Sequence, residues 1–480
     1  EGIIVMTPAI YMIALIISIG ILLLLTLKLK VNSFMALFFT AMALGIFFGA
    51  SPLDTLNAIT GAFGSSLGSI GLPVLFGAIL AMGVQDSGAA IAISNFFVKL
   101  FRGKHLELAP TLTAYIMAIS VFGDISQLLT APIAATIAKR KNLNMSVVTP
   151  YVITAVWFTH GVVPPSAAIL AVAVLLGADV GMVIIWGLII CLAALLIIYF
   201  LTVNWMTKHA SYAAPKPEYT VGIEPARENA TLDELLIKED NIPNTLVAFL
   251  PLVGPAGLIA LASICNMTLP EGNTLRAIMN FAGDKSIAML IGIIILIVTN
   301  GKIKTKMIRN ANRTEKIDEN ASLLELGMGN WVSRAIDVSA MVLMVTAMGA
   351  AFASVLSSQP VVSEIAEVVA SSGIPMILIP FIIAAVMRAA AGSMATASMA
   401  AAGICLPIMS TLGLSPVAVT LAIGLGTVLF GHVNDSGCWM CQEVFNVDLT
   451  QYLKYVSPMA AFGGCVGMAL LMVLSMIGLV

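Results

Sequence analysis

The chain of 480 residues is poor in charge, because Asp, Glu, Lys and Arg together make up 10% of it. A soluble globular domain is about a quarter charged, and a chain of this length would need a polar surface that so few residues cannot supply. The shortage excludes a cytosolic or secreted enzyme, a nucleic-acid-binding protein and a disordered chain. Hydrophobic residues make up 59% of the sequence, which indicates a protein of the lipid bilayer.

Cysteines are also few. The six cysteines are scattered along the chain and indicate no disulfide framework. Cys438 and Cys441 form a CxxC pair, which we interpret as helix packing because no second pair accompanies it. No HExxH motif occurs, so a metal-dependent enzyme within the membrane is disfavoured. We therefore expect a protein that is not an enzyme and that carries no metal or other cofactor.

Apolar runs long enough to cross a membrane predict an all-α polytopic protein. Continuous runs occupy 9–27, 31–50, 70–98, 180–203, 245–265, 286–299, 335–357 and 455–480. Interrupted runs occupy 106–138, 146–177, 373–411 and 415–447, with breaks at 123–124, 160–165, 388–393 and 431–437. The first run ends at Lys28 and Lys30 without a cleavage-type site, so we interpret it as a transmembrane helix and not as a signal peptide.

The distribution of Lys and Arg predicts an orientation. If the N-terminus lies outside and 106–138 and 373–411 are re-entrant hairpins, 20 of the 23 basic residues are cytoplasmic, in agreement with the positive-inside rule. The hairpin assignment is chosen partly to obtain this agreement, since a full crossing by 106–138 would place Lys139-Arg140-Lys141 outside. The same topology places the C-terminus outside.

The two halves of the chain are related. Gly123 and Asp179 are 56 residues apart, as are Gly392 and Asp448, and a histidine lies in the break between each pair. We expect two inverted-topology repeats, each with a re-entrant helical hairpin and a broken transmembrane helix, which is an architecture of secondary transporters. The expected divisions are a first repeat over 1–205, a cytoplasmic linker over 206–244 and a second repeat over 245–480.

The breaks define the predicted site, because non-helical backbone at membrane depth persists only inside protein or beside a wet cavity. Arg388 is the basic residue deep in an apolar run, and two interpretations stay open: an ion pair with Asp124 or Asp435, or an anchor for a substrate carboxylate. Adjacent residues supply a tight turn, hydroxyl groups and free backbone amides, namely Gly392, Ser393 and Thr396.

The acidic and histidine residues in the breaks are candidates for proton coupling. Asp124 and Asp435 can carry protons or bind cations, or each can cap a helix. His160 and His432 occupy matching positions and can relay protons, or each can be a buried histidine that ties its break together. Three other acidic residues lie at expected helix ends, where we interpret them as caps or interfacial charges: Asp86, Asp179 and Asp448.

Three segments carry a family resemblance: Thr159 to Pro165 (THGVVPP), Arg388 to Thr396 (RAAAGSMAT) and His432 to Gly437 (HVNDSG). They resemble the gluconate:proton symporter (gluconate permease) family, in segment order over nearly the whole chain. The resemblance implies proton-driven uptake of a sugar acid or related hydroxy-carboxylate across a bacterial inner membrane. A more remote likeness to the wider ion-transporter superfamily implies a homodimer in which a transport part moves like an elevator against a scaffold.

The chain departs from the family pattern in two places. Ser166-Ala167-Ala168-Ile169 stands where the family has a second histidine and Pro-Gly-Pro, and Asp124 stands where the family has a glutamate. A less polar pocket disfavours a substrate with many hydroxyl groups, because an unpaired buried hydroxyl is costly. A less hydroxylated carboxylate is therefore an alternative substrate to gluconate.

We predict that the protein imports a small organic anion by proton symport. The expected substrate-binding residues are Arg388, Gly392, Ser393, Thr396, Ser166, Asn434 and Ser436, and the expected proton-coupling residues are Asp124, Asp435, His160 and His432. The expected partners are the carboxylate, the proton, membrane lipid and a second copy of the chain, and no nucleic acid. A sodium-coupled carboxylate symporter is the first alternative, because the hydroxyl and amide oxygens suit a hard cation. An anion channel is the second and less favoured alternative.

Overall fold

The computed structural model describes residues 8–226, 231–238, 242–300, 325, 329–357, 373–432 and 435–480. These residues form helices joined by turns and short irregular segments, without a strand among them. Six of the described helical segments are long and apolar enough to cross a membrane, and a seventh is obtained if the bent pair over 274–299 forms one span. The expectation of an all-α, multi-pass membrane protein is confirmed.

The N-terminal part begins with α1 (Pro8–Leu23), η1 (Leu24–Lys28) and α2 (Ser33–Phe47). The single span expected over 70–98 is wrong, because the chain there forms the end of α3 (Pro52–Ser87) followed by α4 (Ala89–Leu100). The hydroxyl of Ser51 accepts from the amide of Asp54, and Pro52 occupies the first turn, so α3 begins well before the apolar run. Gly88 takes the left-handed conformation that ends the helix (φ +71°).

Each of the four expected interruptions is a break between helices. The pairs are α5 (Leu108–Ser120) with α6 (Gly123–Lys141), α7 (Met145–Val162) with α8 (Ala167–Leu175), α17 (Leu378–Ala391) with α18 (Met394–Cys405), and α20 (Pro416–Thr427) with α21 (Ser436–Phe445). The first break falls at Val121 and Phe122, just before the position expected from the sequence, because Gly123 already belongs to α6.

The remaining elements complete the bundle. They are α9 (Val180–His209), η2 (Pro217–Tyr219), α10 (Leu232–Leu235), α11 (Thr245–Thr268), α12 (Thr274–Ala282), α13 (Lys285–Asn300), α15 (Trp331–Ser357), η4 (Leu406–Ile408), α19 (Met409–Leu412), α22 (Leu449–Gln451), η5 (Tyr452–Val456) and α23 (Ser457–Met476). Asp179 caps α9 and Asp448 caps α22 through its side chain, so the interpretation of these two carboxylates as caps is confirmed.

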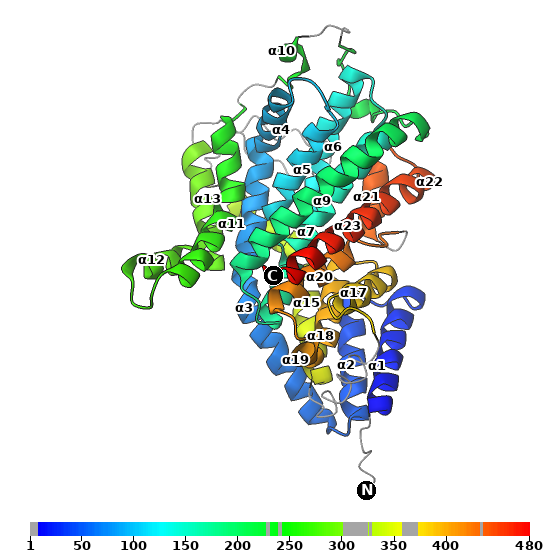
Figure 1. Cartoon of the computed structure of the whole chain (residues 1–480), viewed down its shortest axis with the longest axis vertical. Helices are drawn as coiled ribbons and strands as arrows, with labels where there is room; N and C mark the ends of the chain where they lie inside the picture. Colours follow the sequence, from blue (N-terminus) through cyan, green and yellow to red (C-terminus); the bar gives the residue numbers. More distant parts are fainter. Residues whose placement is uncertain are drawn as a thin grey trace.

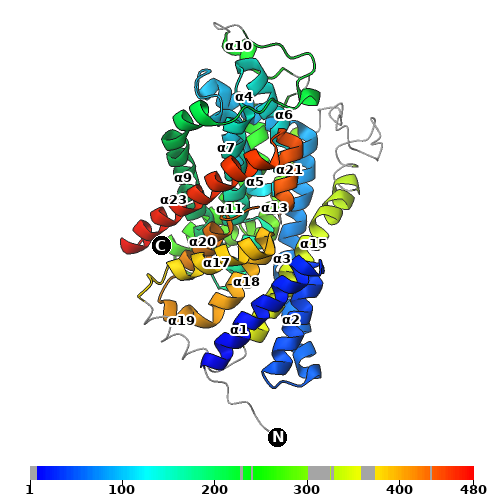
Figure 2. The same cartoon turned by 90° about the vertical axis from the view of Figure 1, so that its right-hand side faces the viewer.

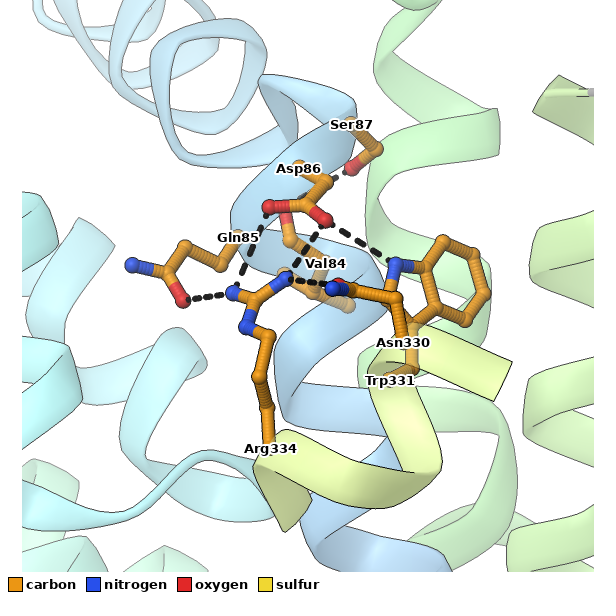
Figure 3. A network of polar contacts seen from close by, with 7 residues as sticks. All are labelled: Val84, Gln85, Asp86, Ser87, Asn330, Trp331 and Arg334. Carbon is orange, nitrogen blue, oxygen red and sulfur yellow. Dashed lines mark hydrogen bonds and ion pairs between the residues drawn. The ribbon is translucent and has the colours of Figure 1, made fainter. Parts of the chain in front are cut away.

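Asp86 belongs to the last turn of α3, and its carboxylate makes an ion pair instead of a cap (Figure 3). The guanidinium of Arg334 on α15 donates to it at 2.8 Å, and the indole nitrogen of Trp331 donates at 2.9 Å. Gln85 accepts a further hydrogen bond from Arg334 at 2.8 Å. Because Asp86 is buried, these donors supply the partners that a carboxylate out of water requires, and they join α3 to α15.

The helices form an elongated bundle with α7 at its centre (Figures 1 and 2). Helix α7 packs against α5, α6, α9, α20 and α23, and all of its residues except His160 are buried. Helices α1 and α2 lie at one end of the molecule and α10 at the other. The break that follows α7 is therefore held in the interior by neighbours on every side.

Candidate functional site

Arg388 lies in the last turn of α17 and is completely buried. Its guanidinium donates to the carbonyl oxygen of Gly392 and forms an ion pair with the carboxylate of Asp435. The guanidinium carbon also lies 5.3 Å from the ring centroid of Trp157, over the indole, where the cation is attracted to the ring. Among the described residues, the Nε group of Arg388 has no hydrogen-bond partner.

Asp435 has two roles at once. Its carboxylate pairs with Arg388, and one of its oxygens accepts from the backbone amide of Gly437 at 2.9 Å, which caps α21. Of the two carboxylates that the sequence offered as partners of Arg388, the structure pairs Asp435 with it. A buried pair of this kind holds two helix breaks together, one after α17 and one before α21.

Asp124 lies in the first turn of α6, and its side chain is exposed. Phe122 is the N-cap residue of this helix, so the interpretation of Asp124 as a cap is wrong. The carboxylate is close enough to Asp435 for the two charges to repel each other. Next to it, a Cβ built on Gly123 would lie 3.4 Å from the ring of His160, so the start of α6 packs against the end of α7.

His160 and Ser166 form a second polar centre, across the break between α7 and α8. The Nδ1 atom of His160 lies 3.1 Å from the hydroxyl oxygen of Ser166, and the rings of Phe122 and His160 lie 6.4 Å apart. A small pocket opens beside them, lined by Val74, Gly77, Ala78, Ile119, Ser120, Val121, Phe122, His160, Pro165, Ser166 and Ala167.

His432 has a different partner from His160, although the two occupy matching positions in the sequence. Its Nε2 atom lies 2.9 Å from the carbonyl oxygen of Ala389 and so ties the α20–α21 break to α17. This contact agrees with the interpretation of His432 as a histidine that ties its break together, and the side chain is partly buried.

The turn after α17 is built from Gly392, Ser393 and Thr396. Gly392 has a φ of +73°, which only glycine adopts at little cost. The hydroxyl of Ser393 accepts from the amide of Thr396 at 3.4 Å and caps α18. The hydroxyl of Thr396 is buried and has no partner among the described residues. Asn434 lies outside the described residues, and Ser436 is placed only as the first residue of α21.

The breaks contact one another in two pairs. A Cβ built on Gly161, at the end of α7, would overlap the side chain of Met394 at the start of α18. A Cβ built on Gly437 would lie 3.5 Å from the amide nitrogen of Gln127 on α6. Close approach at glycine therefore brings the α7–α8 break to the α17–α18 break, and the start of α21 to α6.

Two residues of this region were missed by sequence reasoning. Trp157 lies one turn before His160 on α7, and that spacing on one helix face was the available signal. Gln127 lies one turn after Asp124 on α6; it is 1% exposed, and its Oε1 atom has no partner within the described ranges. Within the described ranges, no three His, Cys, Asp or Glu side chains lie close enough together to hold a metal ion.

Comparison with known proteins gives a consistent result. The profile described as GntP family permease matches residues 10–477. The high-affinity gluconate transporter of Escherichia coli K12 is 30% identical over 468 residues, which cover 96% of this chain and 99% of that protein. The L-idonate transporter of the Gnt-II system in the same organism is 28% identical over 437 residues, covering 91% and 92% of the two chains.

The fold is also similar to that of a solved transporter. The structure of the YdaH transporter of Alcanivorax borkumensis superposes with a TM-score of 0.55 and 15% sequence identity, and the match covers 88% of this chain and 89% of that one. At this identity the likeness concerns the fold alone. It places the described helices in an arrangement that a membrane transporter is known to adopt.

Proposed function

The chain belongs to the GntP family of permeases, and from that premise we propose that it imports a small hydroxy-carboxylate together with a proton. The family consists of transporters and not of enzymes, and the named relatives carry gluconate and L-idonate. The proposed substrate is accordingly a sugar acid or a similar, less hydroxylated acid.

The buried ion pair between Arg388 and Asp435 is the observation that carries the proposal. A guanidinium out of water requires an anionic partner, because an uncompensated buried charge is strongly unfavourable. Asp435 can serve as that partner only while it is ionised. When Asp435 takes up a proton, the carboxylate of the substrate can replace it on the guanidinium, in two-point geometry. Proton binding and substrate binding then require each other, which is what symport needs.

The other members of the site would hold the hydroxyl groups of the substrate. Ser166 and His160 border the pocket beside Phe122, and Thr396 offers a buried hydroxyl without a partner. Gly392 and Ser393 shape the turn that presents the backbone of α18. Asn434 and Ser436 remain proposed contributors, and Asp124 remains a second proposed proton carrier because it is exposed and electrostatically coupled to Asp435.

We further propose two inverted repeats, over 1–205 and 245–480, joined by a cytoplasmic linker at 206–244. The order of elements supports this: the pairs α5–α6 and α7–α8 in the first half correspond to α17–α18 and α20–α21 in the second. Each repeat would contribute one re-entrant hairpin and one broken helix to the site. Movement of these parts against the remaining helices in an elevator-like manner, in a homodimer with both termini outside, completes the proposal.

The test is uptake of radiolabelled gluconate and smaller hydroxy acids by proteoliposomes with an imposed inward proton gradient. The wild-type protein should accumulate substrate, and a protonophore should abolish accumulation. Uptake that ignores the protonophore but disappears when choline replaces sodium would favour the sodium-coupled alternative.

Two variants test whether Arg388 holds the substrate carboxylate. One is Arg388→Lys, and the other is the neutral pair Arg388→Gln with Asp435→Asn, which avoids an unpaired charge. Both should lower substrate affinity, by about 30-fold or more for the neutral pair, because a desolvated charge pair with the substrate is lost. Thermal-shift titration of the purified variants measures the affinity. Unchanged affinity in a folded neutral variant would assign Arg388 a structural role only.

A further inference from the structure

Helix α12 (Thr274–Ala282) is an amphipathic helix whose apolar face is uncovered. Leu275, Ile278 and Phe281 are 54%, 58% and 69% exposed, and no residue of the helix is buried. These side chains recur at every third residue, whereas Arg276 and Asn280 lie on the opposite face of a 3.6-residue helix. Large apolar side chains exposed along one face of an otherwise ordered helix require a covering surface.

The position of α12 relates it to the membrane. It joins the ends of α11 and α13, is bent by 71° relative to α13 and projects sideways from the bundle (Figure 1). Asp179, the N-cap residue of α9, accepts a hydrogen bond from Ser263 near the end of α11. Helix α9 therefore begins close to where α11 ends. Two helices long enough to span a membrane, α9 and α11, therefore begin or end where α12 lies, and the apolar helix α13 begins there as well.

The orientation of α12 is fixed by contacts with α11. The guanidinium of Arg276 donates to the side chain of Asn266 at 2.9 Å and to the carbonyl oxygen of Leu269 at 3.0 Å, which satisfies the end of α11. At the other end, a Cβ on Gly283 would overlap Ala262 and lie 2.5 Å from the carbonyl oxygen of Leu258. The helix is thus attached at both ends, with its apolar face turned away from α11.

The helices on either side of α12 also expose large apolar side chains. On α11, Leu261, Ile264 and Met267 are 50%, 42% and 67% exposed, and on α13 Ile294 and Val298 are 50% and 74% exposed. Helix α11 is long and apolar enough to cross a membrane, and α13 is an apolar helix that reaches that length only together with α12. In a bilayer their outward side chains would meet acyl chains, and the exposed face of α12, which packs against both helices, would meet the same lipid. The nearby charges alternate in sign (Glu271, Arg276, Asp284 and Lys285), so no anionic headgroup is required.

We propose that α12 is an interfacial helix that lies in the plane of the bilayer surface. Leu275, Ile278 and Phe281 enter the acyl region, and Arg276 and Asn280 face water and the headgroups. Helices of this kind bind through the apolar area that they bury at the headgroup boundary. With the outside orientation of this end that the basic residues predict, the leaflet is the outer one.

Spin-label accessibility in phosphatidylcholine nanodiscs tests the proposal. Cys265 and Cys465, the two cysteines that are not buried, are first replaced by serine in the full-length chain. A nitroxide is then attached at Ile278→Cys, with Asn280→Cys on the opposite face as the matched control. We expect power saturation to show the label at 278 relaxed by oxygen and protected from a water-soluble nickel complex, and the reverse at 280.

Two results would overturn the proposal. Equal exposure of both labels to the nickel complex would place α12 in water, away from the bilayer. Protection of the label at 278 from both reagents, together with dipolar broadening between labels, would instead make this face a contact between two copies of the chain. Neither readout depends on transport, so the outcome is independent of the proposed substrate and coupling ion.

Discussion

At the scale of single residues, the proposed mechanism depends on the Arg388–Asp435 pair, which would respond to both a proton and a substrate. The pair is buried, it is supported by the ring of Trp157, and Asp435 also caps α21. A change in the charge of Asp435 therefore alters its ion pair with Arg388 and its cap on α21, and with them the breaks after α17 and before α21.

Asp435→Asn isolates the proton from the substrate. Asparagine resembles the protonated acid in shape and charge. Its side-chain oxygen can still accept the hydrogen bond from the Gly437 amide that caps α21. In the wild type, the proposed release of Arg388 by a proton predicts higher substrate affinity at lower pH; in the variant, affinity should be independent of pH. Binding titrations at several pH values measure this, and downhill exchange should persist while accumulation is lost. A variant that keeps the pH dependence of the wild type would move the coupling role to Asp124 or His160.

Trp157→Leu tests the support beneath the guanidinium. The indole supplies a cation–π contact of about 0.5–2 kcal/mol and excludes water from the pair. We expect substrate affinity to fall about three- to thirtyfold in Trp157→Leu. The affinity of Trp157→Phe, which keeps an aromatic face, should fall less. Thermal-shift titration against the best substrate distinguishes the two, and equal affinities in both variants would contradict a role for the ring face.

At the scale of elements, glycine decides how closely the helices of the site approach. A Cβ built on Gly426 of α20 would overlap the carbonyl oxygen of Phe381 on α17, whereas one built on Gly61 of α3 would meet no atom within 4 Å. The carbonyl oxygen of Phe381 belongs to the backbone and cannot move aside as a flexible side chain can. The close approach of α20 to α17 therefore requires a residue without a Cβ atom at position 426.

Gly426→Ala should therefore destabilise the protein by about 1–3 kcal/mol, the usual cost of overpacking. Gly61→Ala is the matched control and should be neutral or stabilising by up to about 1 kcal/mol, because alanine favours a helix more than glycine does. Apparent unfolding temperatures in detergent report the difference. Equal temperatures for the two variants would show that α17 and α20 adjust without strain.

The junction of α3 and α15 offers a second element-scale test. Arg334→Gln leaves the buried Asp86 without its cation and should cost about 3 kcal/mol or somewhat more. The double variant Asp86→Asn with Arg334→Gln removes both charges and should recover most of that loss. A double variant as unstable as Arg334→Gln alone would indicate that the cost comes from lost packing and not from the uncompensated carboxylate.

At the scale of the whole molecule, the proposed topology can be tested with two exposed positions. Tyr212 follows α9 within the proposed linker, and Glu271 lies between α11 and α12. In the background lacking Cys265 and Cys465, an impermeant maleimide should label Tyr212→Cys only in inside-out vesicles and Glu271→Cys only in right-side-out vesicles, as the basic residues require. Labelling of both from the same side would reject the proposed crossing of α11.

The sequence by itself determined the class of protein and the places where helices break. Low charge and long apolar runs decide between water and lipid. Gly392 and Pro164-Pro165 mark two of the breaks, although other prolines, such as Pro150 and Pro251, lie inside helices. The same local logic identified Asp179 and Asp448 as caps. The apolar runs in the sequence did not predict the start of α3 at Pro52 or the break at Gly88. Hydropathy does not mark a helix boundary that falls within or beside an apolar run.

Only the tertiary structure decided which groups meet. Arg388 lies 47 residues from Asp435, and Asp86 lies 248 residues from Arg334, so each pairing depends on how the helices pack and not on local spacing. The two histidines, alike in sequence position, have different partners for the same reason. The 10% of charged residues supplied the candidates for a mechanism, and the packing of the helices brought Arg388 and Asp435 among them into contact.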